Sequence, residues 1–306
     1  MTETAIALTP AHENRATLFV EDGEVLKVSA FPGKQYIVRL SAPLTARHAR
    51  PGSFVHIQCD TELPMRRPLS IMRAHGSEGW IDLLFKVVGE GLALLAAKKV
   101  GDKPSLIGPI GHPFEPDPQR PNTLLMGGGV GIPPMIFLAE HLANDKNDWS
   151  PLVLMGSEIP FPFELQRSGI ACNWLEAETS SAMPLLERWQ VPSRLASFSE
   201  FDGCHRGFVT ELCEKYLASR SPVEIRETAI FACGPTAMLK TVASLAHQYG
   251  IPCQVSLEEF MACAVGGCAG CAVLVQAPEG PSMKRVCVDG PVFDAATVFP
   301  KVPGTD

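Results

Sequence analysis

Short apolar runs separated by turn sequences characterise the first hundred residues of the chain. Runs rich in Val, Ile and Phe are bounded by turn pairs such as Asp22-Gly23 and Pro32-Gly33. Closely spaced strands without helical periodicity predict a small antiparallel β-barrel. The strands are expected at 16–20, 23–30, 35–40, 53–58 and 80–88, with a helix at 93–99.

From residue 123 the pattern changes to buried strands that alternate with helices. Such alternation predicts an α/β domain with a doubly wound parallel sheet. The Pro-rich polar stretch 114–121 is interpreted as the link between the two domains. Strands are expected at 123–126, 151–155 and 227–232, and helices at 135–143, 211–218 (capped by Thr210) and 237–249.

Composition narrows the class of protein. The chain has 306 residues, of which 46% are hydrophobic and 19% charged, as in a globular protein of about two domains. A net charge of −7 disfavours nucleic-acid binding, which normally needs a basic face. No apolar run reaches the roughly 18 residues of a membrane span, and residues 1–14 lack the pattern of a secretory signal. We therefore expect a cytoplasmic protein.

Four cysteines near the C-terminus carry the strongest chemical signal. Cys263, Cys268, Cys271 and Cys287 form the pattern C-x4-C-x2-C-x15-C, and C-x4-C-x2-C is the spacing of plant-type [2Fe–2S] ferredoxins. Only small residues, Ala, Gly and Val, separate the first three cysteines, as a loop wrapped around a metal–sulfide core requires. Glycine permits positive φ, so backbone N–H groups can turn toward the sulfurs.

Two alternatives remain for these cysteines. A structural zinc site is one, although zinc sites usually show two C-x2-C pairs separated by a longer stretch. Four unrelated buried thiols are the other. Ten cysteines in a chain without a secretory signal favour metal or redox use over disulfides. The remaining thiols are expected to be small buried residues; they are Cys59, Cys172, Cys204, Cys213 and Cys253, while Cys233 is considered separately.

Two stretches are candidate phosphate sites in the first domain. Arg66-Arg67-Pro68-Leu69-Ser70 offers guanidinium groups and a hydroxyl at a strand start, which suit a diphosphate. Gly89-Glu90-Gly91 precedes a helix, whose first N–H groups can bind an anion. Each stretch also has an interpretation without a ligand: the arginine motif could be a solvated strand end, and the glycine motif an ordinary strand-to-helix turn.

The second domain carries a candidate nucleotide site. Gly127–Gly131 joins a strand to a helix, the phosphate-cradling unit of nucleotide-binding folds, although it is not a strict G-x-G-x-x-G. Glu158 follows the second strand, where an acidic residue favours NADH over NADPH, unless it is a solvated loop residue. Cys233 ends a strand and could pack beside a nicotinamide ring or be a buried thiol.

Together these motifs resemble the ferredoxin–NADP+ reductase superfamily over residues 16–293. Within it, the chain most resembles the electron-transfer (iron–sulfur flavoprotein) subunit of class 1B dihydroorotate dehydrogenase. The resemblance implies a Greek-key flavin barrel (12–116), an NAD-binding domain (117–252) and a [2Fe–2S] segment (253–306).

The resemblance also implies roles for individual residues. It places Arg67 on the FAD diphosphate and Ser70 near the flavin ring. Leu92 stands where the family usually has Thr or Ser, so a hydroxyl contact is lost. The implied FAD contacts are Arg67, Pro68, Leu69, Ser70, Leu84, Phe85, Lys86, Gly91 and Leu92. The implied nucleotide contacts are Gly128, Gly129, Gly131, Cys233, Gly234 and Pro235, and the cluster ligands are Cys263, Cys268, Cys271 and Cys287.

The implied activity is electron transfer between NAD(H), FAD and a [2Fe–2S] cluster. A flavin belongs between a hydride donor and a one-electron cluster, and no residue need act as a general acid or base. The expected partner is an FMN-containing dihydroorotate dehydrogenase subunit of pyrimidine biosynthesis, in a heterotetramer. One alternative is a reductase for another acceptor, such as a sulfhydrogenase, an oxygenase or a glutamate synthase. The other is a zinc-stapled nucleotide sensor without catalytic activity.

Overall fold

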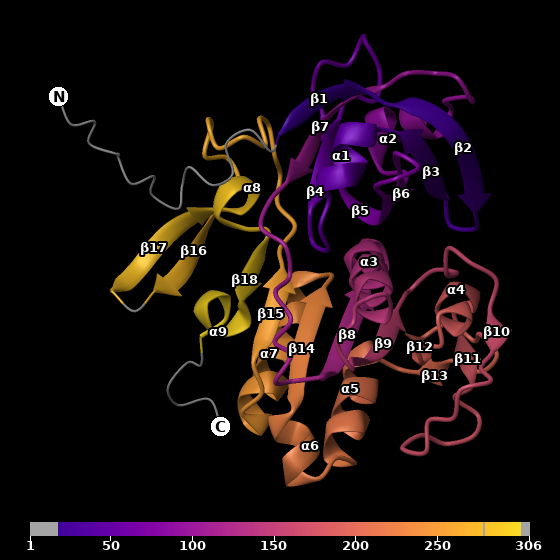
Figure 1. Cartoon of the computed structure of the whole chain (residues 1–306), viewed down its shortest axis with the longest axis vertical. Helices are drawn as coiled ribbons and strands as arrows, with labels where there is room; N and C mark the ends of the chain where they lie inside the picture. Colours follow the sequence, from indigo (N-terminus) through magenta and orange to yellow (C-terminus); the bar gives the residue numbers. More distant parts are fainter. Residues whose placement is uncertain (1–17, 278, 301–306) are drawn as a thin grey trace.

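The computed structural model describes residues 18–277 and 279–300. An antiparallel sheet domain lies at one end and an α/β domain at the other (Figure 1). The C-terminal segment lies beside both domains, and several of its residues, such as Met261 and Cys287, pack against Phe54 and Ile110 of the first domain. In the described residues, no helix is long and apolar enough to cross a membrane.

The first domain is a curled antiparallel half-barrel of seven strands in the order β1-β7-β4-β5-β6-β3-β2. Its alternating residues bury Val38, Leu40, Val55 and Ile57 in one core, as the apolar pattern predicts. The expected antiparallel β class is therefore confirmed. The strands are β1 Phe19–Asp22, β2 Glu24–Phe31, β3 Gln35–Ser41, β4 Phe54–Ile57, β5 Arg67–His75, β6 Trp80–Lys86 and β7 Ser105–Ile110.

Two helices of this domain differ from expectation. Helix α2 (Gly89–Ala96) begins four residues earlier than expected, because the glycines form its first turn instead of preceding it. Helix α1 (Pro43–His48) was not predicted, since six residues are too few to show a helical period. The expected strand at 16–20 lies partly outside the described residues, and β1 begins at Phe19.

The α/β domain is built on a second seven-stranded sheet, in the order β13-β12-β9-β8-β14-β15-β18. All of its neighbouring strands run parallel except β18, which is antiparallel to β15. Leu124, Leu125 and Met126 of β8 are all buried, because both faces of the sheet are covered. The strands are β8 Asn122–Gly128, β9 Ser150–Gly156, β12 Ser193–Ser197, β13 His205–Arg206, β14 Thr228–Cys233, β15 Cys253–Ser256 and β18 Val292–Asp294.

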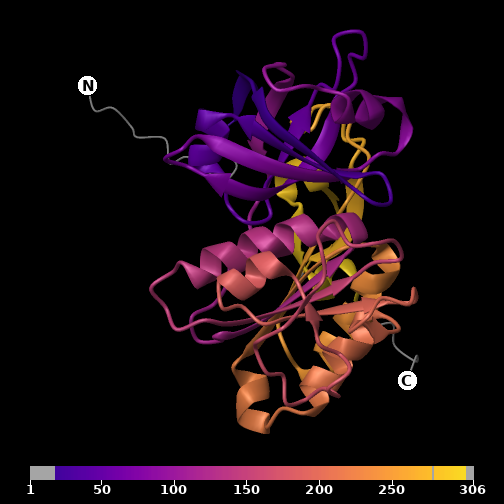
Figure 2. The ribbon, with the colours of Figure 1, turned by 90° about the vertical axis from the view of Figure 1, so that its right-hand side faces the viewer.

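Helices cover both faces of this sheet, which confirms the doubly wound class. Helix α3 (Ile132–Ala143) packs with Leu125, Val153 and Phe231 in one core. Helices α5 (Val209–Ala218) and α7 (Thr236–Tyr249) pack in the other. Figure 2 shows α3 between the sheet and the half-barrel. The remaining short elements are η2 Gly129–Gly131, β10 Gln166–Arg167, β11 Ser181–Ala182, α4 Pro184–Arg188 and α6 Pro222–Arg226.

The predicted cap of α5 is wrong. The helix begins at Val209, so Thr210 lies inside its first turn and Phe208 holds the cap position. Glu211 Oε1 accepts a hydrogen bond from the Phe208 N–H at 3.2 Å. The Glu211 N–H donates to the Phe208 carbonyl at 3.0 Å, so the N–H that a capping hydroxyl would accept already has a partner.

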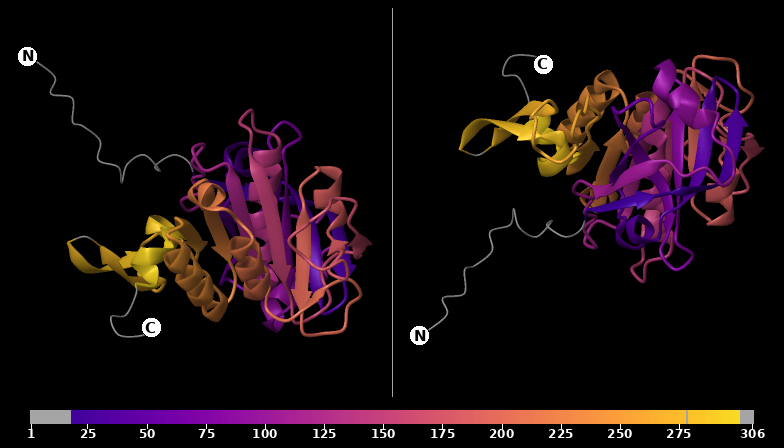
Figure 3. Two further views of the ribbon diagram at one scale, coloured as in Figure 1. Left: turned by 90° about the horizontal axis from the view of Figure 1, so that it is seen from below. Right: turned by 90° about the horizontal axis from the view of Figure 1, so that it is seen from above.

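The C-terminal segment leaves the parallel sheet after β15 and returns to it as β18. Between them lie a loop with three of the four motif cysteines and a hairpin that projects from the body (Figure 3). Met261, Ala264, Cys271 and Cys287 pack against Phe54 and Ile110 of the half-barrel. The elements are β16 Ala272–Ala277, β17 Gly280–Arg285, α8 Val286–Asp289 and α9 Ala295–Val298.

Candidate functional site

The four motif cysteines meet as two pairs. Cys271 Sγ lies 3.3 Å from Cys287 Sγ, and Cys263 Sγ accepts a hydrogen bond from the Cys268 N–H at 3.4 Å. Across residues 18–277 and 279–300, no three His, Cys, Asp or Glu side chains converge on a position for a single ion. The Cys263 and Cys268 side chains also contact each other, so the four thiols form two pairs, which fit a two-iron cluster with two protein ligands on each iron.

The loop backbone turns N–H groups toward sulfur. Ala264, Gly266 and Ala269 have φ of 55°, 80° and 54°. The Gly270 N–H donates to Cys268 Sγ at 3.4 Å. Positive φ was expected at glycines, yet two of these three positions are alanines, a conformation that costs about 1–3 kcal/mol. The surrounding packing therefore holds the loop in a shape that suits a sulfur-rich core.

The thiols differ in their readiness to ionise. Burial disfavours the thiolate of Cys263, but N–H groups including those of Val265 and Cys268 outweigh it and lower its pKa to about 7. Burial, reinforced by Cys271, raises the pKa of Cys287 to about 12. Metal binding requires deprotonated thiols. At Cys287 the protein does not stabilise the thiolate, so positive charge from a bound metal would have to do so.

The two arginines of the first phosphate motif have different tasks. Arg66 donates to the Ser105 carbonyl at 2.7 Å and to its hydroxyl at 3.0 Å, so it ties strand β5 to β7. Arg67 Nη1 donates to the Met65 carbonyl at 2.8 Å. A Cβ at Gly91 would lie 3.4 Å from Arg67 Nε and Nη2, so this guanidinium lies against the first turn of α2. Arg67 and the first N–H groups of α2 therefore lie close together, and donors of this kind suit an anion.

The other predicted flavin contacts fall into two sets. Leu69, Phe85 and Leu92 pack in the half-barrel core, and Leu84 packs toward α3, so they can offer a ligand mainly backbone groups. Ser70 and Pro68 lie on the opposite face of β5 from Leu69. Lys86 is half-buried at the end of β6.

The nucleotide motif lies at the carboxyl edge of the parallel sheet. Cys233 of β14 is directly opposite Gly127 of β8. A Cβ at Gly131 would overlap the Cys233 carbonyl, and one at Gly128 would lie 2.6 Å from Met238 Sδ. These glycines therefore allow two loops to meet. Gly129, with φ of 55° and open space around it, is free to face a ligand.

Cys233 and Glu158 lie at this same edge. Cys233 is buried, and burial raises the pKa of its thiol, followed by the charge of Glu258. Glu158 is exposed just after β9. Glu258 was not predicted: it reaches solvent, yet surrounding protein raises its pKa through burial. Its position directly after the strand ending at Ser256 is the signal that could have found it.

Comparison with known proteins agrees with this geometry. Residues 258–299 match the family model of the iron–sulfur cluster binding domain of dihydroorotate dehydrogenase B. The chain is 33% identical over 283 residues to the dihydroorotate dehydrogenase B (NAD(+)) electron transfer subunit of Desulforamulus reducens, covering 90% of this chain and 96% of the relative. It is 31% identical over 271 residues to the same subunit of Geobacillus thermodenitrificans, covering 87% and 93%.

Solved structures share the fold. An NADH-dependent reduced ferredoxin–NADP oxidoreductase, described in connection with flavin-based electron bifurcation, superposes with a TM-score of 0.71 at 27% identity, covering 90% of this chain and 89% of that one. A ferredoxin reductase of carbazole 1,9a-dioxygenase gives 0.59 at 21% identity and supports the fold alone. From the thiol pairs, the two-domain fold and the near full-length similarity, the chain belongs to the family of dihydroorotate dehydrogenase B electron transfer subunits.

Proposed function

We propose that this protein passes electrons between NAD(H) and a partner enzyme through FAD and a [2Fe–2S] cluster. One observation carries the proposal: Cys271 and Cys287 pack against Phe54 of β4, the strand next to β5 with its Arg67 motif. The cluster loop is thereby held against the strand pair that offers the anion site. A flavin supplies the conversion between a hydride and single electrons.

The half-barrel would bind FAD. Arg67 and the N-terminal turn of α2 would hold the diphosphate, and Ser70 would lie near the ring. Because Leu69, Phe85 and Leu92 pack in the core, they would contribute backbone groups or apolar contacts to the flavin. The proposed FAD contacts are Arg67, Pro68, Leu69, Ser70, Leu84, Phe85, Lys86, Gly91 and Leu92.

The carboxyl edge of the parallel sheet would bind NAD(H). Glu158 would accept hydrogen bonds from the ribose hydroxyls and repel a 2′-phosphate, so we propose a preference for NADH. Cys233 would pack beside the nicotinamide at the strand end. The proposed nucleotide contacts are Gly128, Gly129, Gly131, Glu158, Cys233, Gly234 and Pro235.

The C-terminal segment would hold the cluster through Cys263, Cys268, Cys271 and Cys287. We propose residues 12–116 as the FAD unit, 117–252 as the NAD unit and 253–306 as the cluster unit. Strands β15 and β18 of the last unit extend the parallel sheet, so it is joined firmly to the NAD unit.

An exposed apolar surface adjoins the cluster loop. Phe260 is 93% exposed and Val265 is 49% exposed, on either side of Cys263. Exposed apolar groups beside a redox site suit a protein interface. The named relatives are electron transfer subunits of dihydroorotate dehydrogenase B, so we propose an FMN-containing dihydroorotate dehydrogenase subunit as partner, in a heterotetramer. All ten cysteines are free thiols, which supports a cytoplasmic location.

A reductase for another acceptor is the second candidate. The structural similarity to the NADH-dependent reduced ferredoxin–NADP oxidoreductase favours it, since that protein is named for a different oxidoreductase activity. Purification of the tagged chain from its own cells, with identification of the protein bound to it, distinguishes the two candidate functions. A dihydroorotate-oxidising subunit supports the first candidate, and a different oxidoreductase supports the second.

Purification without oxygen tests the cofactors. We expect FAD, two irons and two sulfides per chain, and loss of visible absorbance on addition of NADH. Cys268→Ser should lose the cluster and keep FAD, whereas the control Cys172→Ser, a thiol outside the motif, should keep both. A colourless protein that contains zinc would contradict the proposal.

A further inference from the structure

Strand β4 presents different side chains on its two faces. Val55 and Ile57 point into the half-barrel core. Phe54 points the other way and packs with Met261 and Cys271 of the cluster segment. By the two-residue period of a strand, His56 lies on the same outer face as Phe54. His56 therefore lies where the half-barrel meets the cluster segment.

His56 lies between the two proposed cofactor sites. It is directly opposite Pro68 of the FAD motif, just as Phe54 is opposite Ser70. Its ring faces the main-chain carbonyls of Met261, two residues before the ligand Cys263, and of Arg66. The side chain thus spans the boundary between the flavin strand and the cluster loop.

The His56 imidazole is buried away from water and lacks hydrogen-bond partners in the part of the chain that the structure describes. His56 is 1% exposed, and within the described residues neither ring nitrogen makes a hydrogen bond of normal geometry. An unpartnered buried polar group costs about 1–3 kcal/mol, so its retention needs a reason. The two facing carbonyls are close enough to favour the protonated ring, which makes them the partners that a small shift would engage.

Burial and neighbouring positive charge keep the ring neutral. Burial lowers the pKa of His56, and the positive charges of Arg66 and Arg67 lower it further. A neutral imidazole has one N–H donor and one acceptor, whereas both facing carbonyls are acceptors. Only one of them can therefore receive the ring proton.

We propose that His56 is a positioning residue: with flavin and cluster bound, a small shift lets its ring N–H donate to the Met261 carbonyl and so fixes the cluster loop against the flavin strand. The proposal rests on the proposed function, because it assigns the cluster to this loop and FAD to the Arg67–Ser70 face. The hydrogen bond holds the entry of the loop at a set distance from the strand that would carry the flavin. Passage of electrons between the two sites depends on that distance, while hydride transfer from the nicotinamide to the flavin does not pass through this contact.

Three variants separate the hydrogen bond from packing. His56→Leu fills the space without an N–H, and His56→Gln restores an N–H donor without the ring. His56→Phe serves if the leucine variant does not fold. Thr123→Val is the matched control, because Thr123 is also buried with an unpartnered side-chain oxygen but lies in β8 of the other domain.

The experiment uses the anaerobic holoprotein and three readouts. Hydrogen–deuterium exchange follows the amides of 258–271, stopped-flow absorbance follows flavin and cluster reduction separately, and potentiometry gives the cluster midpoint potential. For His56→Leu we expect at least tenfold faster exchange of the loop and at least tenfold slower cluster reduction. Flavin reduction by NADH should change less than twofold. His56→Gln should recover most of both losses, and Thr123→Val should match the wild type in all readouts.

Two results would overturn the inference. One is loop exchange, cluster potential and cluster reduction unchanged in His56→Leu or His56→Phe. The other is a glutamine variant as impaired as the leucine variant, which would leave packing alone as the role. A wild-type protein without flavin or cluster would instead overturn the proposed function, so the two failures are distinguishable.

Discussion

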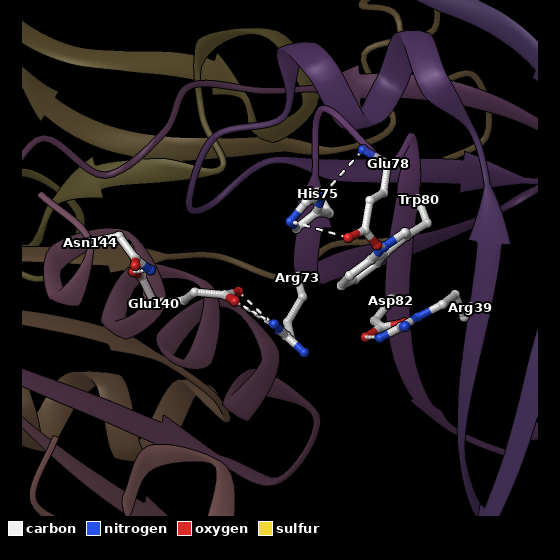
Figure 4. A network of polar contacts seen from close by, with 8 residues as sticks. All are labelled: Arg39, Arg73, His75, Glu78, Trp80, Asp82, Glu140 and Asn144. Atoms are coloured by element: carbon white, nitrogen blue, oxygen red, sulfur yellow. Dashed lines mark hydrogen bonds and ion pairs between the residues drawn. The ribbon is translucent and has the colours of Figure 1, made fainter. Parts of the chain in front are cut away.

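Arg73 of β5 and Glu140 of α3 form a forked ion pair that joins the half-barrel to the α/β domain (Figure 4). Arg73 Nε lies 3.0 Å from Glu140 Oε2, and Nη2 binds Oε1. The guanidinium also lies 5.3 Å from the ring centre of Trp80 and 5.2 Å from that of Trp189. Both charged side chains are less than one-fifth exposed, so the pair is a specific contact between domains.

Breaking this pair should weaken the domain contact. We expect Glu140→Gln to lower the free energy of unfolding by about 1–3 kcal/mol, because it leaves a partly buried guanidinium without its charge partner. Urea unfolding of the holoprotein measures the change. The control is Lys103→Met, which removes an exposed pair with Glu24 at 3.6 Å and should cost less than about 0.5 kcal/mol. Equal effects of the two substitutions would contradict the assignment.

Arg67 should govern FAD affinity in a way that other arginines of the domain do not. Arg67→Ala should weaken FAD binding by about ten- to a hundredfold, the loss of one or two charge-assisted hydrogen bonds. Fluorescence titration of the deflavinated chain with FAD measures it. Arg47→Ala, an exposed arginine on α1, should bind FAD as the wild type does. The same affinity in Arg67→Ala would refute the phosphate role.

Two neighbouring glycines of the cluster loop should respond differently to alanine. Gly266 has φ of 80°, and a Cβ there would lie 2.6 Å from Val288 Cγ2. Gly267 has open space around its Cβ position. Gly266→Ala should lose most of the iron and sulfide, whereas Gly267→Ala should keep both. Iron and sulfide analysis after anaerobic purification distinguishes them, and equal retention would show that loop shape does not limit assembly.

A carboxylate–histidine pair predicts how stability depends on pH. Glu211 Oε2 lies 2.8 Å from His205 Nε2, and this hydrogen bond lowers the pKa of Glu211. A lowered carboxyl pKa gives stability that is present above the unfolded value, about 4.3, and is lost as pH falls through the folded value. Glu211→Gln should therefore melt below the wild type at about pH 5.

The gap between the two melting temperatures should shrink as pH falls below the unfolded pKa of about 4.3 and through the lowered folded pKa, and should close once the carboxyl is protonated in both states. Calorimetric scans across that range measure it. A gap of constant size at every pH would mean that the side chain contributes through packing and not through its charge.

Short-range sequence patterns were enough to predict features that depend only on neighbouring residues. The spacing of Cys263, Cys268 and Cys271 confines three thiols to one loop, whatever the rest of the chain does. Glycine-punctuated apolar runs likewise identified strands β2 to β4 and β8 within a few residues. The cap of α5 could not be predicted, because the choice between Thr210 and Phe208 depends on where the helix meets the sheet.

Pairings between distant residues were beyond the reach of the sequence. Arg66 and Arg67 are adjacent and chemically identical, and only strand β7 and helix α2 give one a structural bond and the other an anion site. Periodicity could not show that His56 faces Met261, since the half-barrel and the cluster loop are far apart along the chain.

The amino-acid sequence by itself determined the fold class, the order of half-barrel, α/β domain and C-terminal segment, and the cysteine motif that we propose holds the cluster. These depend on residue type and short-range spacing, which the chain carries wherever it folds. Tertiary structure decided which charged side chains pair, that the ring nitrogens of His56 are buried away from water, and how closely the cluster loop approaches strand β5. Those outcomes depend on contacts between surfaces that exist only once both domains have formed.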